Sequence, residues 1–166
     1  AYTVEDPPEM PLNGWHGAGY CRQTWVAGDE NSDWFESMRG VLRSQPANSR
    51  TVLLISEIRN EQSARMALRA ASNGFLVITT GFATDIPSGL SDLVRLLGAD
   101  GSVGLAAVLR LVLLQRLQNG VISTQFLVSP DGASSVAIKL RSSQMQHLAS
   151  DIQFQANRAM LGEQLL

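Results

Sequence analysis

Two short apolar runs with a helical segment between them constrain the fold of this chain more than any other feature. The first run covers residues 51–55 and the second covers residues 75–80. Continuous runs of this kind are typical of strands that are buried on both faces of a parallel sheet. Residues 61–72 are expected to form a helix, which Asn73-Gly74 closes in the usual way. Strand, helix and strand in this order predict an α/β fold with a mostly parallel sheet.

The remaining segments extend this pattern in both directions. Upstream, residues 1–4 are expected to form a strand that Pro7-Pro8 stops, and residues 13–32 an ordered but irregular loop. A helix is expected from Asp33 until Pro46 ends it. Downstream, we expect a helix from Pro87 or Ser88 to near Gly98, followed by an apolar helix over 103–117 that Asn119-Gly120 caps. Residues 125–129 and 135–140 are expected to form a β-hairpin, and helices are expected from Ser142 onward.

Composition excludes several classes of function. The 166 residues carry a net charge of −2, whereas domains that bind nucleic acid through phosphate contacts are usually strongly basic. Cys21 is the only cysteine, so neither an internal disulfide nor a four-thiolate zinc site is expected. The longest apolar run, residues 103–114, is too short to span a bilayer. With no signal-peptide pattern at the start, a cytoplasmic location is expected.

Charged residues follow the expected strands, where open α/β sheets bind their ligands. Residues 5–9 contain three acids, and Glu57 ends the first apolar run. An apolar strand that ends in an acid has the form of a Walker B element, whose carboxylate reaches Mg²⁺, directly or through water, or polarises the attacking water. Such strands also end in Glu by chance. The nearby Arg59, Arg65 and Arg69 are equally consistent with a solvated helix face that has Glu61 as a partner.

Several segments, in collinear order, resemble the type II/type IV secretion ATPase family, which includes pilus-retraction motors. Residues 3–9 look like its acidic Asp box, and residues 54–60 are similar to its Walker B segment, normally Gly-Glu-Met/Ile-Arg-Asp. Residues 75–84 occupy the place of its His box, and residues 114–117 and 141–153 resemble later elements. The resemblance implies a RecA-like fold. Residues 1–141 would form a partial RecA-like core, and residues 142–166 a C-terminal helical segment of the same domain.

The resemblance also implies a function, a hexameric ATP-driven motor for pilus retraction, pilus assembly or secretion. Its cofactors would be ATP and Mg²⁺, and its partners would be further copies of itself and an inner-membrane platform protein, without direct nucleic-acid contact. Glu9 and Glu57 match the family's catalytic glutamates, and Glu5 and Asp6 would support the acidic cluster near Mg²⁺. Arg59 matches the Walker B arginine, and the sequence leaves open whether it faces nucleotide or structure. No separate metal-ligand set is assigned.

The departures from the family pattern keep an alternative open. The chain contains no Gly-x-x-x-x-Gly-Lys-[Ser/Thr] loop, which in the family precedes the Asp box, so we expect the chain to be a fragment. Phe75 and Phe82 replace the His-box histidines, and phenyl rings favour burial in a sheet–helix core. Ser56 and Asn60 replace the Walker B Gly and Asp. The alternative is therefore a catalytically degenerate ring subunit or scaffold that retains the fold without hydrolysis. A third hypothesis is that the chain is a plain α/β binding domain whose similarity to the family is a coincidence.

Overall fold

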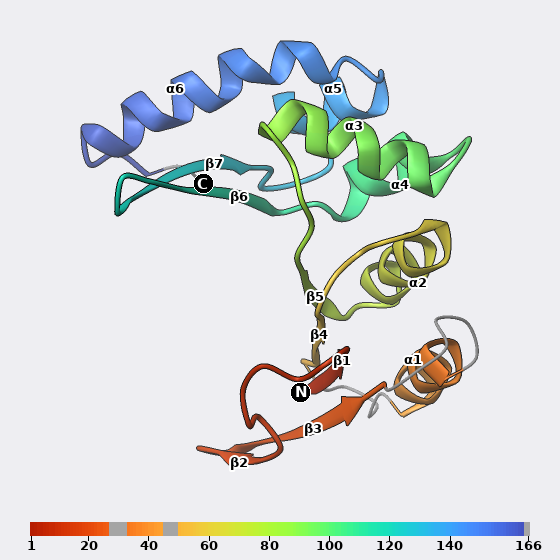
Figure 1. Cartoon of the computed structure of the whole chain (residues 1–166). Helices are drawn as coiled ribbons and strands as arrows, with labels where there is room; N and C mark the ends of the chain where they lie inside the picture. Colours follow the sequence, from red (N-terminus) through yellow and green to blue (C-terminus); the bar gives the residue numbers. More distant parts are fainter. Residues whose placement is uncertain (27–32, 45–49, 165–166) are drawn as a thin grey trace. The chain divides into compact units, whose positions relative to one another are not determined.

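The computed structural model describes residues 1–26, 33–44 and 50–164. The chain forms two compact units, Ala1–Gly81 and Phe82–Leu166, which are described separately (Figure 1). The division expected from the sequence, at residue 141 within one domain, stays a prediction. In the described ranges no helix has the length and apolar character needed to cross a membrane.

The first unit is built on a five-stranded sheet in the order β2-β3-β1-β4-β5. The central strand β1 (Tyr2–Glu5) is parallel to β3 (Gly19–Trp25) and to β4 (Val52–Ile55). In turn β4 is parallel to β5 (Leu76–Thr79), whereas the short β2 (Gly14–His16) is antiparallel to β3. The mostly parallel sheet predicted from the apolar runs is thus confirmed. The parallel register also brings the carboxyl ends of the four parallel strands to one edge of the sheet.

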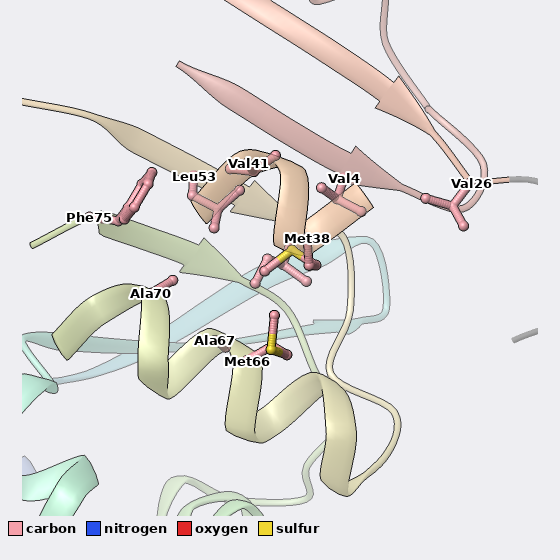
Figure 2. Packing of buried hydrophobic residues seen from close by; sticks show 10 residues of the cluster. Val4, Val26, Met38, Val41, Leu53, Met66, Ala67, Ala70 and Phe75 are labelled. Carbon is pink, nitrogen blue, oxygen red and sulfur yellow. The ribbon is translucent and has the colours of Figure 1, made fainter. Parts of the chain in front are cut away.

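Two helices, α1 (Asp33–Arg43) and α2 (Glu61–Ser72), cover one face of this sheet (Figure 1). Alternate strand residues such as Val4 and Leu53 point to that face and pack against Met38 of α1 and Met66 of α2 (Figure 2). The opposite face is more open, because Leu76 is 57% and Ile78 50% exposed. The prediction of burial on both faces is therefore wrong for β5, whose Leu76 and Ile78 side chains are half exposed.

The helix α2 has the bounds expected from the sequence because both of its ends are marked. At the N-terminus the Asn60 side chain accepts a hydrogen bond from the Ser63 N–H (2.9 Å), and the Ser63 hydroxyl accepts one from the Asn60 N–H (3.1 Å). This reciprocal pair is a capping box. At the C-terminus Gly74 adopts φ 93°, a left-handed conformation that favours glycine.

The prediction of an irregular loop over residues 13–32 is wrong for residues 14–25. Strands β2 and β3 form a hairpin there, in which Trp15 lies opposite Tyr20. Their rings pack edge to face with centroids 5.3 Å apart, and β3 gains further hydrogen bonds from β1. The rest of the loop, residues 27–32, and the predicted helix end at Pro46 lie outside the described residues.

The second unit combines a two-stranded sheet with helices. It contains α3 (Ile86–Leu97), α4 (Gly101–Val108), β6 (Leu111–Gln118), β7 (Val121–Val128), α5 (Ser135–Arg141), the 3-10 helix η1 (Met145–His147) and α6 (Leu148–Met160). The helix predicted over 103–117 is wrong, because α4 ends at Val108 and β6 follows. Asn119 (φ 51°) and Gly120 (φ 78°) make a tight hairpin turn between β6 and β7 instead of a helix cap.

The late hairpin is therefore present, but it lies at 111–128 and not at 125–140. Residues 135–140 belong to α5, since the Ser134 hydroxyl accepts a hydrogen bond from the Ala137 N–H (3.2 Å) and caps a helix. Lys139, the only lysine of the chain, pairs with Asp151 of α6 at 2.5 Å and so joins these two helices. The C-terminal helices predicted after Ser142 are confirmed as η1 and α6.

Candidate functional site

The carboxyl edge of the sheet carries the residues that the sequence placed at strand ends. Asp6 follows β1 directly, and Ser56-Glu57 follows β4. The Ser56 N–H donates to the Val4 carbonyl (3.2 Å), and the Ile58 N–H donates to the Thr80 carbonyl (3.0 Å). The Thr80 hydroxyl also donates to the Ser56 carbonyl. These backbone contacts hold the loop after β4 between its two neighbouring strands, so the position of Glu57 is fixed by the sheet.

Arg59 links two of the predicted site acids in a small open pocket at this edge. Its Nε donates to Glu57 Oε2 (2.9 Å), and one terminal nitrogen lies 3.5 Å from Asp6 Oδ2. The Glu57 side chain is 22% exposed, whereas those of Asp6 and Arg59 are 41% and 48% exposed. Arg59 therefore contacts both acids of the pocket. Because ion pairs this exposed are weak, ligand groups can compete for the two carboxylates.

Asn60 and Ser63 form the opposite wall of the pocket at the start of α2. The Ser63 hydroxyl accepts hydrogen bonds from the backbone N–H groups of Arg59 (3.2 Å) and Asn60 (3.1 Å). Asn caps helices as well as Asp does, so Asn60 fills the structural role that an Asp would have at this position. The substitution leaves the pocket with one carboxylate fewer.

Glu5 lies at the same edge but contacts a different partner. It is 5% exposed, and its carboxylate accepts a hydrogen bond from Gln23 Nε2 (2.8 Å). The Gln23 amide also donates to the Met10 carbonyl (2.7 Å) and accepts from the Leu12 N–H (3.0 Å). Glu5 and Gln23 together hold residues 6–13 in place. Gln23 was not anticipated, because it lies in the segment for which the sequence predicted no regular structure.

Glu9 is not brought to this pocket. Its side chain is exposed, and it forms no hydrogen bond or ion pair with any other residue of the described ranges. Arg65, by contrast, pairs with Glu61 one helical turn away at 2.8 Å, which confirms the solvated helix face for that residue. The assignments of Glu9 and Glu57 as catalytic, and of Glu5, Asp6 and Arg59 as nucleotide-binding, stay predictions.

The pocket fits one part of a magnesium–nucleotide site. Mg²⁺ is usually held by one or two carboxylates together with water and phosphate oxygens, and Asp6 and Glu57 supply two carboxylates that share one arginine. The pocket has a volume of about 40 Å³, room for about one or two waters and not for a nucleotide. Within the described ranges no group of three or more His, Cys, Asp or Glu side chains could hold a metal by itself.

The family model described as "Type II/IV secretion system protein" matches residues 1–156. The chain belongs to this family. Among curated relatives, it is 35% identical over 94 residues to the protein transport protein HofB homolog of Haemophilus influenzae, covering 57% of this chain and 18% of the relative. It is 30% identical over 122 residues to the type IV pilus assembly ATPase PilB of Pseudomonas aeruginosa, covering 73% of this chain and 19% of the relative.

Two solved structures of ATPases have the same fold. The pilus retraction motor PilT with bound ADP superposes with a TM-score of 0.74 at 26% identity, over 92% of this chain and 44% of that one. The ATPase DotB of Legionella pneumophila gives a TM-score of 0.64 over 96% of this chain and 46% of that one, and at 17% identity it supports the fold alone. The chain thus spans about a fifth of the curated relatives and less than half of these solved chains.

Proposed function

We propose that this chain is the acid-bearing part of the ATP-hydrolysing domain of a motor ATPase for pilus retraction, pilus assembly or secretion. One observation carries the proposal: Asp6, Glu57 and Arg59 meet at the carboxyl edge of a parallel sheet, the place where such folds bind their ligands. The names of the relatives, a pilus assembly ATPase and a retraction motor with bound ADP, support the choice of chemistry.

In this proposal each residue has a distinct task. Glu57, the least exposed of the three, orients and polarises the attacking water. Asp6 would help to hold Mg²⁺ through water, and Arg59 keeps the two carboxylates at one edge before nucleotide binds. Bound Mg²⁺ would neutralise charge on the phosphate oxygens. Glu5 acts through Gln23 by fixing residues 6–13, the segment that carries Asp6 and Glu9.

The proposal extends to the assembly. We expect the protein to act as a hexamer in the cytoplasm, with ATP and Mg²⁺ as cofactors, bound to an inner-membrane platform protein of a pilus or secretion machine and without direct nucleic-acid contact. These statements rest on membership of the family. Hydrolysis also requires a phosphate-binding loop, and residues 1–166 contain no Gly-x-x-x-x-Gly-Lys-[Ser/Thr] motif.

The test uses a protein that joins residues 1–166 to a phosphate-binding loop. Glu57→Gln should lower kcat by about 100-fold or more, because an amide cannot act as a base, while ATP binding persists. Glu61→Gln is the matched control, since Glu61 is exposed and contacts only Arg65 in the described structure. Turnover of Glu57→Gln equal to that of the control would contradict the assignment.

A second candidate function is a ring subunit that keeps the fold without hydrolysing ATP. It is favoured by the phenyl rings at positions 75 and 82 and by the pairing of Arg59 with both pocket acids. A hexamer in sedimentation together with turnover no higher than that of the Glu57→Gln variant would select this candidate.

A further inference from the structure

A second hollow of the first unit lies away from the pocket acids, between α1 and the strands β1 and β3. Its lining includes Tyr2, Arg22 and Thr24 from the strands and Ser37, Gly40 and Ser44 from α1. None of these residues lines the acidic pocket. The hollow has a volume of about 320 Å³, roughly ten times the share of one water in the liquid. We call it the α1–β3 groove.

Three side chains of the α1–β3 groove have hydrogen-bond donors to spare. Arg22 is exposed, and Thr24 and Ser37 are half-buried. Within the described ranges, none of these three side chains makes a hydrogen bond or ion pair. Arg22 and Thr24 are two residues apart on β3, so their side chains lie on the same face of the sheet, the face that α1 covers. The groove therefore presents a guanidinium and two hydroxyls that no described partner uses.

The other polar groups of the groove are already engaged. The Tyr2 hydroxyl donates to the Ser44 carbonyl (2.9 Å), and the Ser44 hydroxyl donates to the Gly40 carbonyl (2.7 Å). No carboxylate is among the described residues of the lining. Glu36, next to Ser37 in the chain, pairs with Arg39 at 2.7 Å. Among the described lining residues, none carries a negative charge that balances that of Arg22.

Because Gly40 has no side chain, α1 leaves open space on its side of the groove. Apart from the adjacent residues and the backbone of its own helix, a Cβ added at this position would meet no described atom within 4 Å. Glycine inside a helix is less favourable than alanine, and packing against the core does not require it here. The open space that Gly40 leaves faces the same hollow as the spare donors.

We propose that the α1–β3 groove binds a phosphate dianion, either inorganic phosphate or the phosphate group of a small monoester. The planar fork of arginine matches the oxygens of phosphate, and the hydroxyls of Thr24 and Ser37 supply further donors. A tetrahedral group with several acceptor oxygens fits the groove, because donors come both from β3 (Arg22 and Thr24) and from α1 (Ser37). The proposal is independent of ATP hydrolysis, since it uses no residue of the acidic pocket.

The experiment titrates the 166-residue chain with inorganic phosphate and, separately, with glycerol 3-phosphate, at constant ionic strength, by ¹H–¹⁵N NMR. Saturable shifts are expected in the amides of residues 22–24 and 37–40. Stronger binding of the ester would identify a phosphomonoester as the ligand, and binding of inorganic phosphate alone would identify the free anion. Shifts that do not saturate for either probe would overturn the proposal.

Two variants and one control assign the binding to the groove. Arg22→Gln should weaken binding by about tenfold or more, because a hydrogen bond to a charged group is lost. Gly40→Leu should also weaken binding, by filling the hollow from the helix side. Arg69→Gln removes another exposed arginine, on α2, and should leave the affinity unchanged. Amide spectra with native dispersion show that each variant is folded. Equal weakening by Arg22→Gln and Arg69→Gln would show general attraction of anions and would refute the site.

Discussion

At the scale of single residues, Phe75 and Phe82 have opposite environments. Phe75 packs in the core of the first unit and is 4% exposed, as a phenyl ring favours, whereas Phe82 is 90% exposed. Phe75→His should lower the free energy of unfolding by about 1–3 kcal/mol, because apolar burial is lost and a polar ring is left unpaired. Phe82→His should change it by less than about 0.5 kcal/mol. Denaturant unfolding of both variants measures this, and equal losses would contradict the structure.

Asp85 provides a second prediction at this scale, one that depends on pH. Its carboxylate caps α3, and the hydrogen bond from the Ser88 N–H (2.7 Å) is the main reason why the pKa of Asp85 lies below its ordinary value. A lowered pKa in the folded state stabilises the fold above the pKa of the unfolded chain, about 3.9, and this stabilisation disappears as the pH falls through the folded value. Acid should therefore reduce the stability advantage of the wild type over Asp85→Asn.

The comparison with Asp85→Asn isolates the charge, because asparagine caps a helix without titrating. Asp85→Ala removes the cap itself and should destabilise the second unit at neutral and at acidic pH. Unfolding free energies measured between pH 7 and pH 3 test both statements. A wild-type advantage over Asp85→Asn that is constant across this range would show that Asp85 has the same pKa in the folded and unfolded chain.

At the scale of elements, one glutamine joins α6 to β7. The Gln155 side chain accepts a hydrogen bond from the Val128 N–H (2.7 Å) and donates one to the Val128 carbonyl (2.9 Å), as a neighbouring strand would. Gln155→Ala should cost about 1–3 kcal/mol, because both backbone groups of Val128 lose their partner. Hydrogen exchange at the Val128 amide should accelerate. Gln153→Ala is the control, since Gln153 bonds only to the exposed Asn157, and an equal effect of the two changes would refute the link.

The elements that the sequence predicted best are those with local signals at both ends. The helix α2 has Asn60 before it and Asn73-Gly74 after it, and its bounds were right. The stretch 103–117 was predicted as one helix because it is apolar almost throughout. There the choice between helix and strand depends on pairing across the turn at Asn119-Gly120, with partners such as Leu113 opposite Phe126, which local composition does not reveal.

At the scale of the whole molecule, the sequence predicted that charged residues follow the ends of parallel strands, where open α/β sheets bind their ligands. The structure brings Asp6, Glu57 and Arg59 together at that edge, with Arg59 in contact with both acids. The sequence could not predict that Glu5 would turn to Gln23, since that contact depends on β3 lying beside β1. The open face at Leu76 and Ile78 was also missed, because burial depends on what surrounds a strand as well as on its own residues.

The last prediction concerns nucleotide binding by the 166-residue chain alone. ATP is held mainly by backbone N–H groups of a glycine-rich loop and by its lysine, and the chain has no such loop. Its only lysine is engaged with Asp151, and the acidic pocket, at about 40 Å³, does not enclose a nucleotide. Calorimetry should therefore detect no micromolar binding of Mg²⁺-ATP, and turnover should equal that of a heat-denatured control. The positive control is the same chain joined to a phosphate-binding loop. Micromolar affinity of the chain alone would mean that it holds the phosphates by another route.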